Sequence, residues 1–436
     1  MNTLTAARGQ MEVSLGFHMI FAAIGIGMPV LMLAAEALHL RTGKTHYREL
    51  ARMWGKATAV LFAIGAVSGT ALSFELGLLW PRFMRIAGPV VGPAFALEGY
   101  AFFIEAIFVG LYLYGWDRLS PRAHLLTGIP VALSGLVSGA IVLGANAWMQ
   151  HPVGFDLIDG RPANIHPGAV FTNPYWFSLA IHSTLSCYIA TGFAAAGVYA
   201  LGMLRGRRDD YHRSALSIAL ALATVTAILQ LASGDLSARN AAEYQRTKLA
   251  ALEAHFETAR DVPILVGGLP DPDTGTVRFG IHVPYGLSTL AYHDPHAVVH
   301  GLNEVPRADR PNVVICHLAF QTMVGCGTLL IVIGLAYWLW RWRRGAVLHD
   351  HLLRALVLAS PLGFVALEAG WLVTEAGRQP WVIYGVQRTR DAVTTAEHVG
   401  ASFLAFSVLY LALAVAVVLL LLALAKKRHS HTAEAT

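Results

Sequence analysis

Charged residues are scarce in this sequence. Asp, Glu, Lys and Arg make up 14% of its 436 residues, while 55% are hydrophobic and the mean hydropathy is +0.53. A soluble domain carries about 25% charged residues, so a series of ordinary water-soluble domains is excluded. Although the net charge is +5, the chain has no water-soluble domain that could present a basic surface to nucleic acid. The composition predicts a polytopic membrane protein.

Cysteine is also scarce. The three cysteines, Cys187, Cys316 and Cys326, each lie in an apolar run. They form no C-x-x-C pair and no disulfide framework. No internal repeat is evident either, so the duplicated halves common in transporters are not indicated.

Long hydrophobic runs, in contrast, fill most of the chain. A helix that crosses the hydrocarbon core needs about 20 apolar residues. The first run is too long for a signal peptide. The sequence therefore predicts an all-α, polytopic bundle of nine transmembrane helices. Their expected ranges are 14–38, 55–79, 93–115, 125–147, 174–204, 214–233, 312–340, 352–374 and 393–425.

Basic residues gather in alternate connections between these runs. Short cytoplasmic loops are enriched in Lys and Arg, so this asymmetry predicts an N-terminus outside and a C-terminus in the cytoplasm. The richer connections hold Arg41, Lys44, Arg48, Arg52, Arg118, Arg122, Arg205, Arg207, Arg208, Arg213, Arg341, Arg343, Arg344, Arg354, Lys426, Lys427 and Arg428. The poorer ones hold Arg8, Arg82, Arg85, Arg161, Arg378, Arg388 and Arg390.

One long connection divides the chain into three parts. Residues 1–233 hold the first six helices, 234–311 form a connection on the outer side, and 312–436 hold the last three helices and a tail. Long loops in compact proteins are usually functional or disordered. The stretch 238–260 is typical of an amphipathic surface helix, which favours function. By themselves, its Lys248 and Glu253 would be solvated surface charges.

Histidines inside the predicted runs are candidate ligands, because ionisable side chains are costly in the membrane. Those histidines are His18, His182, His317 and His398. His18, His182 and Met323 lie in the outer halves of their runs. A His facing a Met suits a low-spin haem, whereas one axial ligand leaves an open position on a high-spin haem. Each His could instead be a hydrogen-bonded helix contact, and His317 competes with Met323.

Carboxylates also occur within the runs. Glu98 and Glu105 are seven residues apart, nearly on one helical face. They suit a proton relay, or two protonated carboxyls that bond neighbouring helices. Glu368 and Glu375 repeat the spacing. Glu375 could bind a metal or simply cap its helix in a pair with Arg378.

Seven segments, spread from the first run to the last, carry a family resemblance. They are Gly16-Phe-His18-Met-Ile-Phe, Glu98 to Gly110 with Gly115-Trp-Asp-Arg118, Asn146-Ala-Trp-Met-Gln150, Ile181-His182, Gln245 to Glu253, Met323-Val-Gly325, and Gly370-Trp to Gly377-Arg-Gln-Pro-Trp381. The chain resembles subunit I of the cytochrome bd family of bacterial quinol oxidases. With its modest loop it looks most like the short-loop, cyanide-insensitive branch.

The resemblance implies three haems near the outer face. His182 and Met323 look like the axial pair of a low-spin haem b. His18 and Glu375 look like the ligands of a high-spin haem b and a haem d, or of a further haem b in place of haem d. Arg378 would steady haem propionates or Glu375.

Two further residues belong to the implied haem surroundings, Trp371 and Gln321. Gln321 stands where better-known members of the family carry Arg. An Arg there would place a positive charge beside the low-spin haem and raise its potential.

The resemblance also implies the reaction, a quinol:dioxygen oxidoreduction. Glu253 would accept a quinol proton, Lys248 would position the quinol oxygen, and Glu105 and Glu98 would deliver cytoplasmic protons. Dioxygen would be reduced to water and a membrane potential formed without a pump. Two rival functions are a haem-carrying electron-transfer anchor and a proton-coupled transporter.

The partners implied are a second subunit, a small single-helix accessory subunit, membrane lipids and ubiquinol or menaquinol. No nucleic acid is expected. The expected location is the bacterial cytoplasmic (inner) membrane.

Overall fold

Helices long and apolar enough to cross a membrane form the body of the protein. The computed structural model describes residues 2–345 and 348–433, and within these ranges nine such crossings are found. The all-α prediction is therefore confirmed. The crossings are α1 (Thr3–Thr42), α2 (Thr45–Leu79), α3 (Pro81–Tyr114), α4 (Pro121–Gln150), α6 (Pro174–Leu204), α7 (Asp210–Tyr244), α10 (Val313–Arg344), α11 (Asp350–Ala359) with α12 (Leu362–Ala376), and α14 (Val399–Ala433).

Most helices are longer than the apolar runs that predicted them, and polar side chains cap the N-termini of several. Asn2, Ser120, Asn173 and Asn312 each accept a hydrogen bond from a backbone N–H in the first turn of the helix that follows. These caps lie outside the hydrophobic runs, so a hydropathy window cannot detect them. The eighth crossing is divided between α11 and α12 at Pro361, which lacks the N–H that a continuous helix needs.

Two helix boundaries differ from the prediction in ways that affect candidate residues. α7 continues beyond 233 to Tyr244, so the sixth crossing reaches into the predicted connection. α14 begins at Val399, so His398 lies before the helix, with an exposed side chain and a φ of 65°. The placement of His398 inside a span was wrong.

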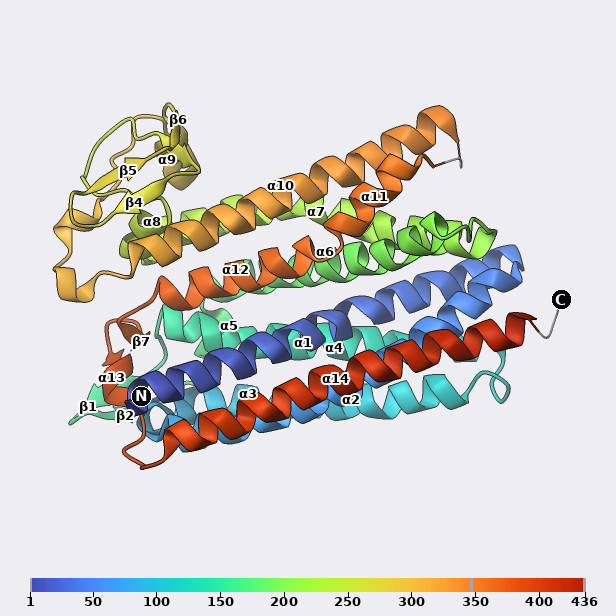
Figure 1. The fold of residues 1–436 in the computed structure, drawn as a ribbon. Helices are drawn as coiled ribbons and strands as arrows, with labels where there is room; N and C mark the ends of the chain where they lie inside the picture. The colour runs from blue at the N-terminus through green and yellow to red at the C-terminus, as the bar shows by residue number, and fades with distance from the viewer. Residues whose placement is uncertain (1, 346–347, 434–436) are drawn as a thin grey trace.

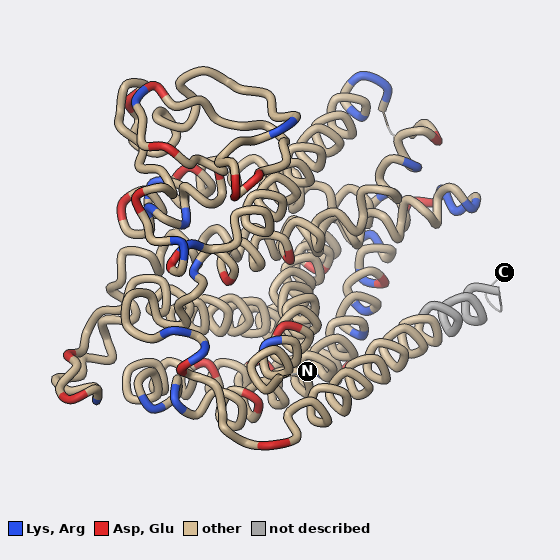
Figure 2. Tube along the Cα trace, turned by 60° about the vertical axis from the view of Figure 1, so that its left-hand side comes forward, with Lys and Arg blue, Asp and Glu red and all other residues tan. Residues whose placement is uncertain are grey.

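The crossings run side by side and give the molecule two distinct ends (Figure 1). One end, here called the loop end, carries the connection between α7 and α10 and the N-terminus. The other, here called the basic end, carries the connections 43–44 and 115–120. Lys, Arg, Asp and Glu lie mostly toward the two ends (Figure 2). α1 is central, because it packs on α2, α4, α6 and α14.

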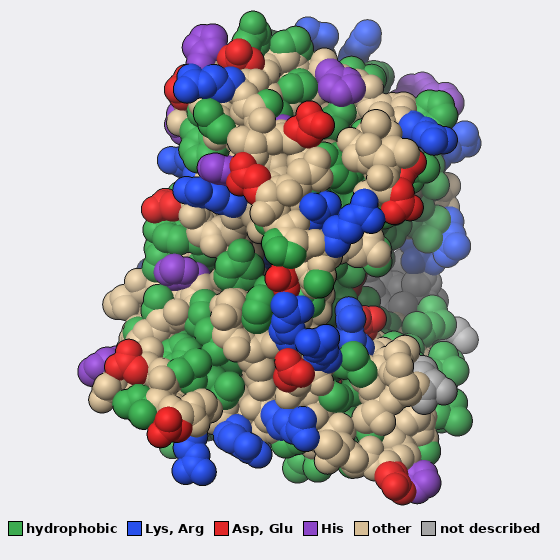
Figure 3. All heavy atoms as spheres, turned by 90° about the vertical axis from the view of Figure 1, so that its left-hand side faces the viewer, with side chains coloured by type: hydrophobic (Ala, Val, Ile, Leu, Met, Phe, Trp, Pro, Cys, Tyr) green, Lys and Arg blue, Asp and Glu red, His purple; other side chains and the backbone are tan. Residues whose placement is uncertain are grey.

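The connection between α7 and α10 is an ordered cap on the loop end. It contains α8 (Arg246–Leu252), α9 (Gly286–Tyr292), and the single turns η1 (Leu302–Glu304) and η2 (Arg307–Asp309). Strands β3 (Ile264–Val266) and β6 (Ile281–Val283) pair antiparallel, as do β4 (Leu269–Asp271) and β5 (Thr276–Arg278). Figure 3 looks onto this end, where histidine and charged side chains are spread over the surface.

The expected surface helix over 238–260 is wrong in two respects. The helix is interrupted at Gln245, and the short helix α8 ends at Leu252. Leu249, Ala250, Ala251 and Leu252 are all buried, because the hairpins and η1 cover them. Lys248 and Glu253 are therefore enclosed instead of solvated, while other charged residues of this segment, such as Arg246 and Glu257, remain exposed.

Short elements complete the loop end. They are β1 (Asp156–Ile158) paired with β2 (Arg161–Ala163), α5 (Ala169–Thr172), β7 (Trp381–Ile383) paired with β8 (Gln387–Arg388), and α13 (Thr389–Ala392). The three cysteines are unpaired, as predicted.

Candidate functional site

The His18 imidazole is held by the neighbouring helix α2. Its Nδ1 atom lies 2.9 Å from the Ser68 hydroxyl oxygen, and that hydroxyl donates to the Ile64 carbonyl oxygen at 3.0 Å. Because the single hydroxyl hydrogen is used in this way, Nδ1 must donate to Ser68. Nε2 then carries a lone pair, which is the state in which a histidine binds a metal. Gly69 makes room for the ring, since a Cβ there would lie 2.9 Å from His18 Cε1.

His182 on α6 repeats this arrangement with α7. Its Nδ1 atom lies 3.0 Å from the Ser233 hydroxyl oxygen, and Ser233 donates to the Gln230 carbonyl oxygen at 3.0 Å. Gly234 follows the serine, just as Gly69 follows Ser68. The structure thus prepares two histidines on different helices in the same way, each with its Nε2 lone pair available.

Met323 on α10 packs closely on α12. A Cβ at Gly370 would lie 2.9 Å from the Met323 sulfur, so only glycine permits this approach. α6 and α10 share α7 and α12 as packing neighbours. His182 and Met323 therefore belong to helices that surround a common region.

His317, the competitor of Met323, is fully buried and engaged elsewhere. Its Nδ1 is 2.7 Å from the Leu252 carbonyl oxygen and its Nε2 is 3.0 Å from the Gly267 carbonyl oxygen. Neither nitrogen is left for a metal. His317 instead attaches the loop-end cap to α10.

Gln321 has the same attaching role. Its Oε1 accepts from the Gly267 N–H at 2.8 Å, and its Nε2 donates to the Leu265 carbonyl oxygen at 3.0 Å. Both ends of the amide are thus committed to the cap.

Glu375 and Arg378 form an ion pair where α12 ends. Arg378 Nη2 donates to Glu375 Oε2 at 2.5 Å, and Asn146 of α4 donates to Glu375 Oε1 at 2.9 Å. Arg378 is 1% exposed, and its Nε and Nη1 have no hydrogen-bond partner among the described residues. Burial lowers the pKa of this guanidinium below its ordinary value, and the negative charge of Glu375 opposes that shift only in part. The unpaired N–H groups are suited to an anionic group of a cofactor.

Two other residues of α12, one aromatic and one acidic, precede this pair along the helix. Trp371, half-buried, is one helical turn before Glu375. Glu368 lies against α1, because a Cβ at Gly16 would be 3.4 Å from its Oε2.

A chain of hydrogen bonds connects Glu375 to the cap. Asn146 accepts from Gln150 Nε2 at 3.3 Å, and Gln150 Oε1 accepts from the Lys248 ammonium group. Gln245 donates to the Gln150 carbonyl oxygen at 2.6 Å and so fixes the start of α8. The cap and the candidate ligand Glu375 are therefore parts of one polar network.

Lys248 and Glu253 are deeply buried, at 4% and 2% exposure. Burial, aided by the Arg378 charge, lowers the pKa of Lys248 to about 7. Burial raises the pKa of Glu253 to about 8. Both Glu253 oxygens lack a hydrogen-bond partner among the described residues. The ionised form of such a buried carboxyl can take a proton from a bound molecule, and the fraction in that form grows as the pH approaches 8.

Glu98 and Glu105 lie on α3 against α4. Glu98 Oε1 accepts from the Ser138 hydroxyl at 3.2 Å. Glu105 is 5% exposed and packs on Gly135, where a Cβ would lie 3.4 Å from its Oε2. Since α3 runs from the loop end to the basic end, Glu105 is the carboxylate nearer the basic end.

The residues present fit haem. Two histidines offer Nε2 lone pairs, Met323 offers a thioether, Glu375 offers a carboxylate, and Arg378 offers unpaired N–H groups toward a propionate. Ser68, Ser233 and the bridging role of Asn146 and Gln150 were not predicted from the sequence. The repeated Ser-Gly dipeptide is a signal that could have indicated the two serines.

Comparison with known proteins identifies the family. The family described as "Cytochrome bd terminal oxidase subunit I" matches residues 6–429. The chain is 37% identical over 418 residues to the putative cytochrome bd menaquinol oxidase subunit I of Bacillus subtilis, covering 94% of each chain. It is 28% identical over 482 residues to the cytochrome bd-II ubiquinol oxidase subunit 1 of Escherichia coli, covering 94% of this chain and 93% of the other.

A solved structure agrees with these relatives. The bd oxidase from Geobacillus thermodenitrificans matches with a TM-score of 0.93 and 37% identity, covering 98% of this chain and 99% of that one. The matches run from α1 into α14, so the resemblance is confirmed over nearly the whole chain. By this evidence of sequence and fold, the chain belongs to the family of cytochrome bd terminal oxidase subunit I.

Proposed function

We propose that this chain oxidises quinol at its loop end and supports the reduction of dioxygen to water with protons drawn from its basic end. The two relatives named above are described as a putative menaquinol oxidase subunit and a ubiquinol oxidase subunit, and the family as a terminal oxidase subunit. The observation that carries the proposal is the matched preparation of His18 and His182, each with Nδ1 bonded to a serine that bonds a backbone carbonyl.

The candidate ligands divide into a low-spin and a high-spin set. His182 and Met323 would hold a low-spin haem b, and His18 and Glu375 a high-spin haem b and a haem d, or a further haem b in its place. The haems held by these residues would supply the electron transfer from quinol to dioxygen. Arg378 would pair with a propionate through its unpaired N–H groups. Trp371 would pack in the same surroundings.

Glu253 and Lys248 would bind quinol. Glu253 has two buried oxygens without a hydrogen-bond partner among the described residues, and its pKa of about 8 is close to the working pH. A base of this kind would take the quinol proton. Lys248 would orient the quinol oxygen from its position on Gln150. The protons released here would leave at the loop end.

Glu105 and Glu98 would carry protons the other way, from the basic end toward the haem ligands. Uptake at one end and release at the other would form a membrane potential without a pump. This scheme requires the basic end to face the cytoplasm, as the Lys and Arg distribution predicts.

The setting follows from family and composition. The chain is a multi-pass bacterial membrane protein and, as a subunit I, pairs with a subunit II. The cytoplasmic (inner) membrane and a small accessory subunit belong to the proposal.

The test is oxygen consumption by the purified complex with short-chain ubiquinol and menaquinol analogues. We expect uptake that depends on one or both quinols and yields water. A complex with full haem content that consumes no oxygen with either quinol would instead be an electron-transfer anchor.

The close approach of Met323 to Gly370 gives a second test. We expect Gly370→Ala to displace the thioether, because the new Cβ would lie 2.9 Å from the sulfur. The low-spin haem band should shift or weaken in the reduced spectrum. Gly110→Ala on α3, where a Cβ meets nothing within 4 Å, is the control and should leave the band unchanged. An unaltered band in the Gly370→Ala variant would argue against Met323 as a ligand.

A further inference from the structure

Glu36 and His124 form a buried pair near the basic end. Both are 2% exposed, and His124 Nδ1 is 2.7 Å from Glu36 Oε1. His124 Nε2 is 2.8 Å from the Tyr112 carbonyl oxygen. A carbonyl only accepts, so Nε2 carries a hydrogen, and the proton between Nδ1 and Glu36 can belong to either group. The pair therefore holds one exchangeable proton.

The pair also has unused hydrogen-bonding capacity. Glu36 Oε2 and the Tyr112 hydroxyl are buried and have no hydrogen-bond partner among the described residues. The Tyr112 hydroxyl and the Glu36 carboxylate are neighbours that interact weakly, short of the geometry of a regular hydrogen bond. Buried polar atoms without partners are destabilising. Such atoms are suited to a place that receives a water molecule or a proton for part of the time.

A single layer of side chains separates the pair from the surface of the basic end. The Trp116 ring centroid lies 4.0 Å from that of His124, and the Arg52 guanidinium carbon lies 5.1 Å from the Trp116 ring centroid. Arg52 Nη2 in turn pairs with Asp117 at 2.8 Å, and the Asp117 side chain is 81% exposed. Protons in the solvent at this end need to pass only this layer to reach His124.

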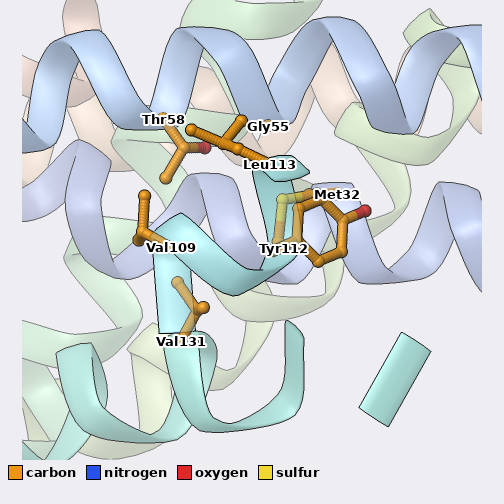
Figure 4. A pocket seen from close by; sticks show the side chains of 7 residues that line it. All are labelled: Met32, Gly55, Thr58, Val109, Tyr112, Leu113 and Val131. Atoms are coloured by element: carbon orange, nitrogen blue, oxygen red, sulfur yellow. The ribbon is translucent and has the colours of Figure 1, made fainter. Parts of the chain in front are cut away.

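On its inner side the pair adjoins a narrow, mainly apolar cavity. The Tyr112 ring, Met32, Thr58 and Val109 contribute to its wall (Figure 4). As it stands, it has no room for the centre of a water molecule. Met32, with its flexible thioether side chain, is the wall residue best able to move.

The far end of the cavity lies close to Glu105. Val109 is one helical turn from Glu105 on α3. Val131, also in the wall, is one turn from Gly135, which packs on the Glu105 carboxylate. From Tyr112 to Glu105 the helix rises about 10 Å, a distance that a few water molecules can bridge.

We propose that the Glu36–His124 pair takes up protons at the basic end and donates them to Glu105. In each transfer one proton moves from the pair to the Glu105 carboxylate, and the pair regains one from solvent. No other bond is formed or broken, and the charge of the pair is restored. The cavity acts as a gate that admits water when Met32 moves. This inference rests on the proposed function, since it takes Glu105 as a proton carrier for dioxygen reduction.

The test uses the fully reduced complex mixed with dioxygen in the presence of a pH-indicator dye. Glu36→Gln keeps the shape and a hydrogen bond to His124 but cannot exchange protons. We expect it to slow proton uptake by about tenfold or more, with the absorbance change of oxygen binding at the wild-type rate. The matched control is Asp209→Asn, because Asp209 also pairs with a histidine at the basic end, His212, but on α7. Asparagine keeps the helix cap, so the control should take up protons normally.

A parallel Glu105→Gln variant separates the possible failures. Slow uptake in Glu105→Gln with normal uptake in Glu36→Gln would overturn the inference and leave the proposed function intact. Normal uptake in both variants would overturn the proton route of the proposed function as well. If Glu36→Gln does not assemble with haem, His124→Gln replaces it with the same expected and contrary results.

Discussion

Replacing Glu253 by glutamine is expected to lower quinol oxidation at limiting quinol by about a hundredfold, within the range that a positioned general base contributes. Glutamine has nearly the same size and is uncharged, so the cap should fold as before. The variant loses only the capacity to accept a proton. The measurement is quinol-dependent oxygen consumption by a complex whose haem content matches the wild type.

The pH dependence of this reaction follows from the raised pKa of Glu253. With a pKa of about 8, Glu253 is mainly protonated at neutral pH, and its basic, ionised form increases as the pH rises through 8. The wild-type rate at limiting quinol should therefore rise from about pH 7 to about pH 9, with its midpoint near the pKa of Glu253, and then level off. The Glu253→Gln variant should lack this rise.

Glu257→Gln is the matched control, because Glu257 lies four residues further along the same segment and is exposed. It should retain both the rate and the pH profile. A Glu253→Gln variant with full activity, or with an unchanged pH profile, would remove Glu253 from the quinol site.

Replacing Met323 by leucine is expected to abolish the low-spin haem signal. The volume of the side chain is nearly conserved, so the stability cost should stay below about 1.5 kcal/mol. Leucine has no sulfur to bind iron, and a haem b with one remaining axial ligand becomes high-spin. The measurement is the reduced-minus-oxidised spectrum of the purified complex, combined with its haem content.

His317→Ala distinguishes the two candidate ligands. Because both His317 nitrogens face backbone carbonyls of the cap, this variant should loosen the cap and weaken quinol binding while the low-spin signal persists. If His317→Ala abolishes the signal and Met323→Leu preserves it, the ligand assignment is wrong.

The sequence predicts the architecture well because the dominant signal is local. Each crossing contains a run of apolar residues long enough to span the membrane, so the existence of every crossing helix follows from composition. The ends of the helices do not follow, since caps such as Ser120 and Asn312 lie outside the runs. The N-cap residue Ser120 starts α4 early enough to include His124, whereas the hydropathy prediction starts this helix at residue 125.

The burial of the candidate site could not be predicted from local sequence. Lys248 and Glu253 have the pattern of solvated charges, and only the family resemblance assigned them a role. They are enclosed by hairpins and turns that follow later in the chain, including β3 and η1. Likewise, Glu36 and His124 are 88 positions apart, and no spacing rule connects them. Gln321 illustrates the same limit, because its loop contacts at Leu265 and Gly267 depend on tertiary structure.

The central claim is that this chain holds haem with an open position for dioxygen. The most direct test is the dithionite-reduced minus air-oxidised spectrum of the purified complex, recorded with and without carbon monoxide. We predict two sets of haem bands. The bands of the haem with an open position shift with carbon monoxide, and the bands of the low-spin haem do not. A shifted band far to the red would identify haem d, and b-type bands alone would identify the all-haem-b form. A properly assembled complex without haem, or with haem that does not respond to carbon monoxide, would contradict the account.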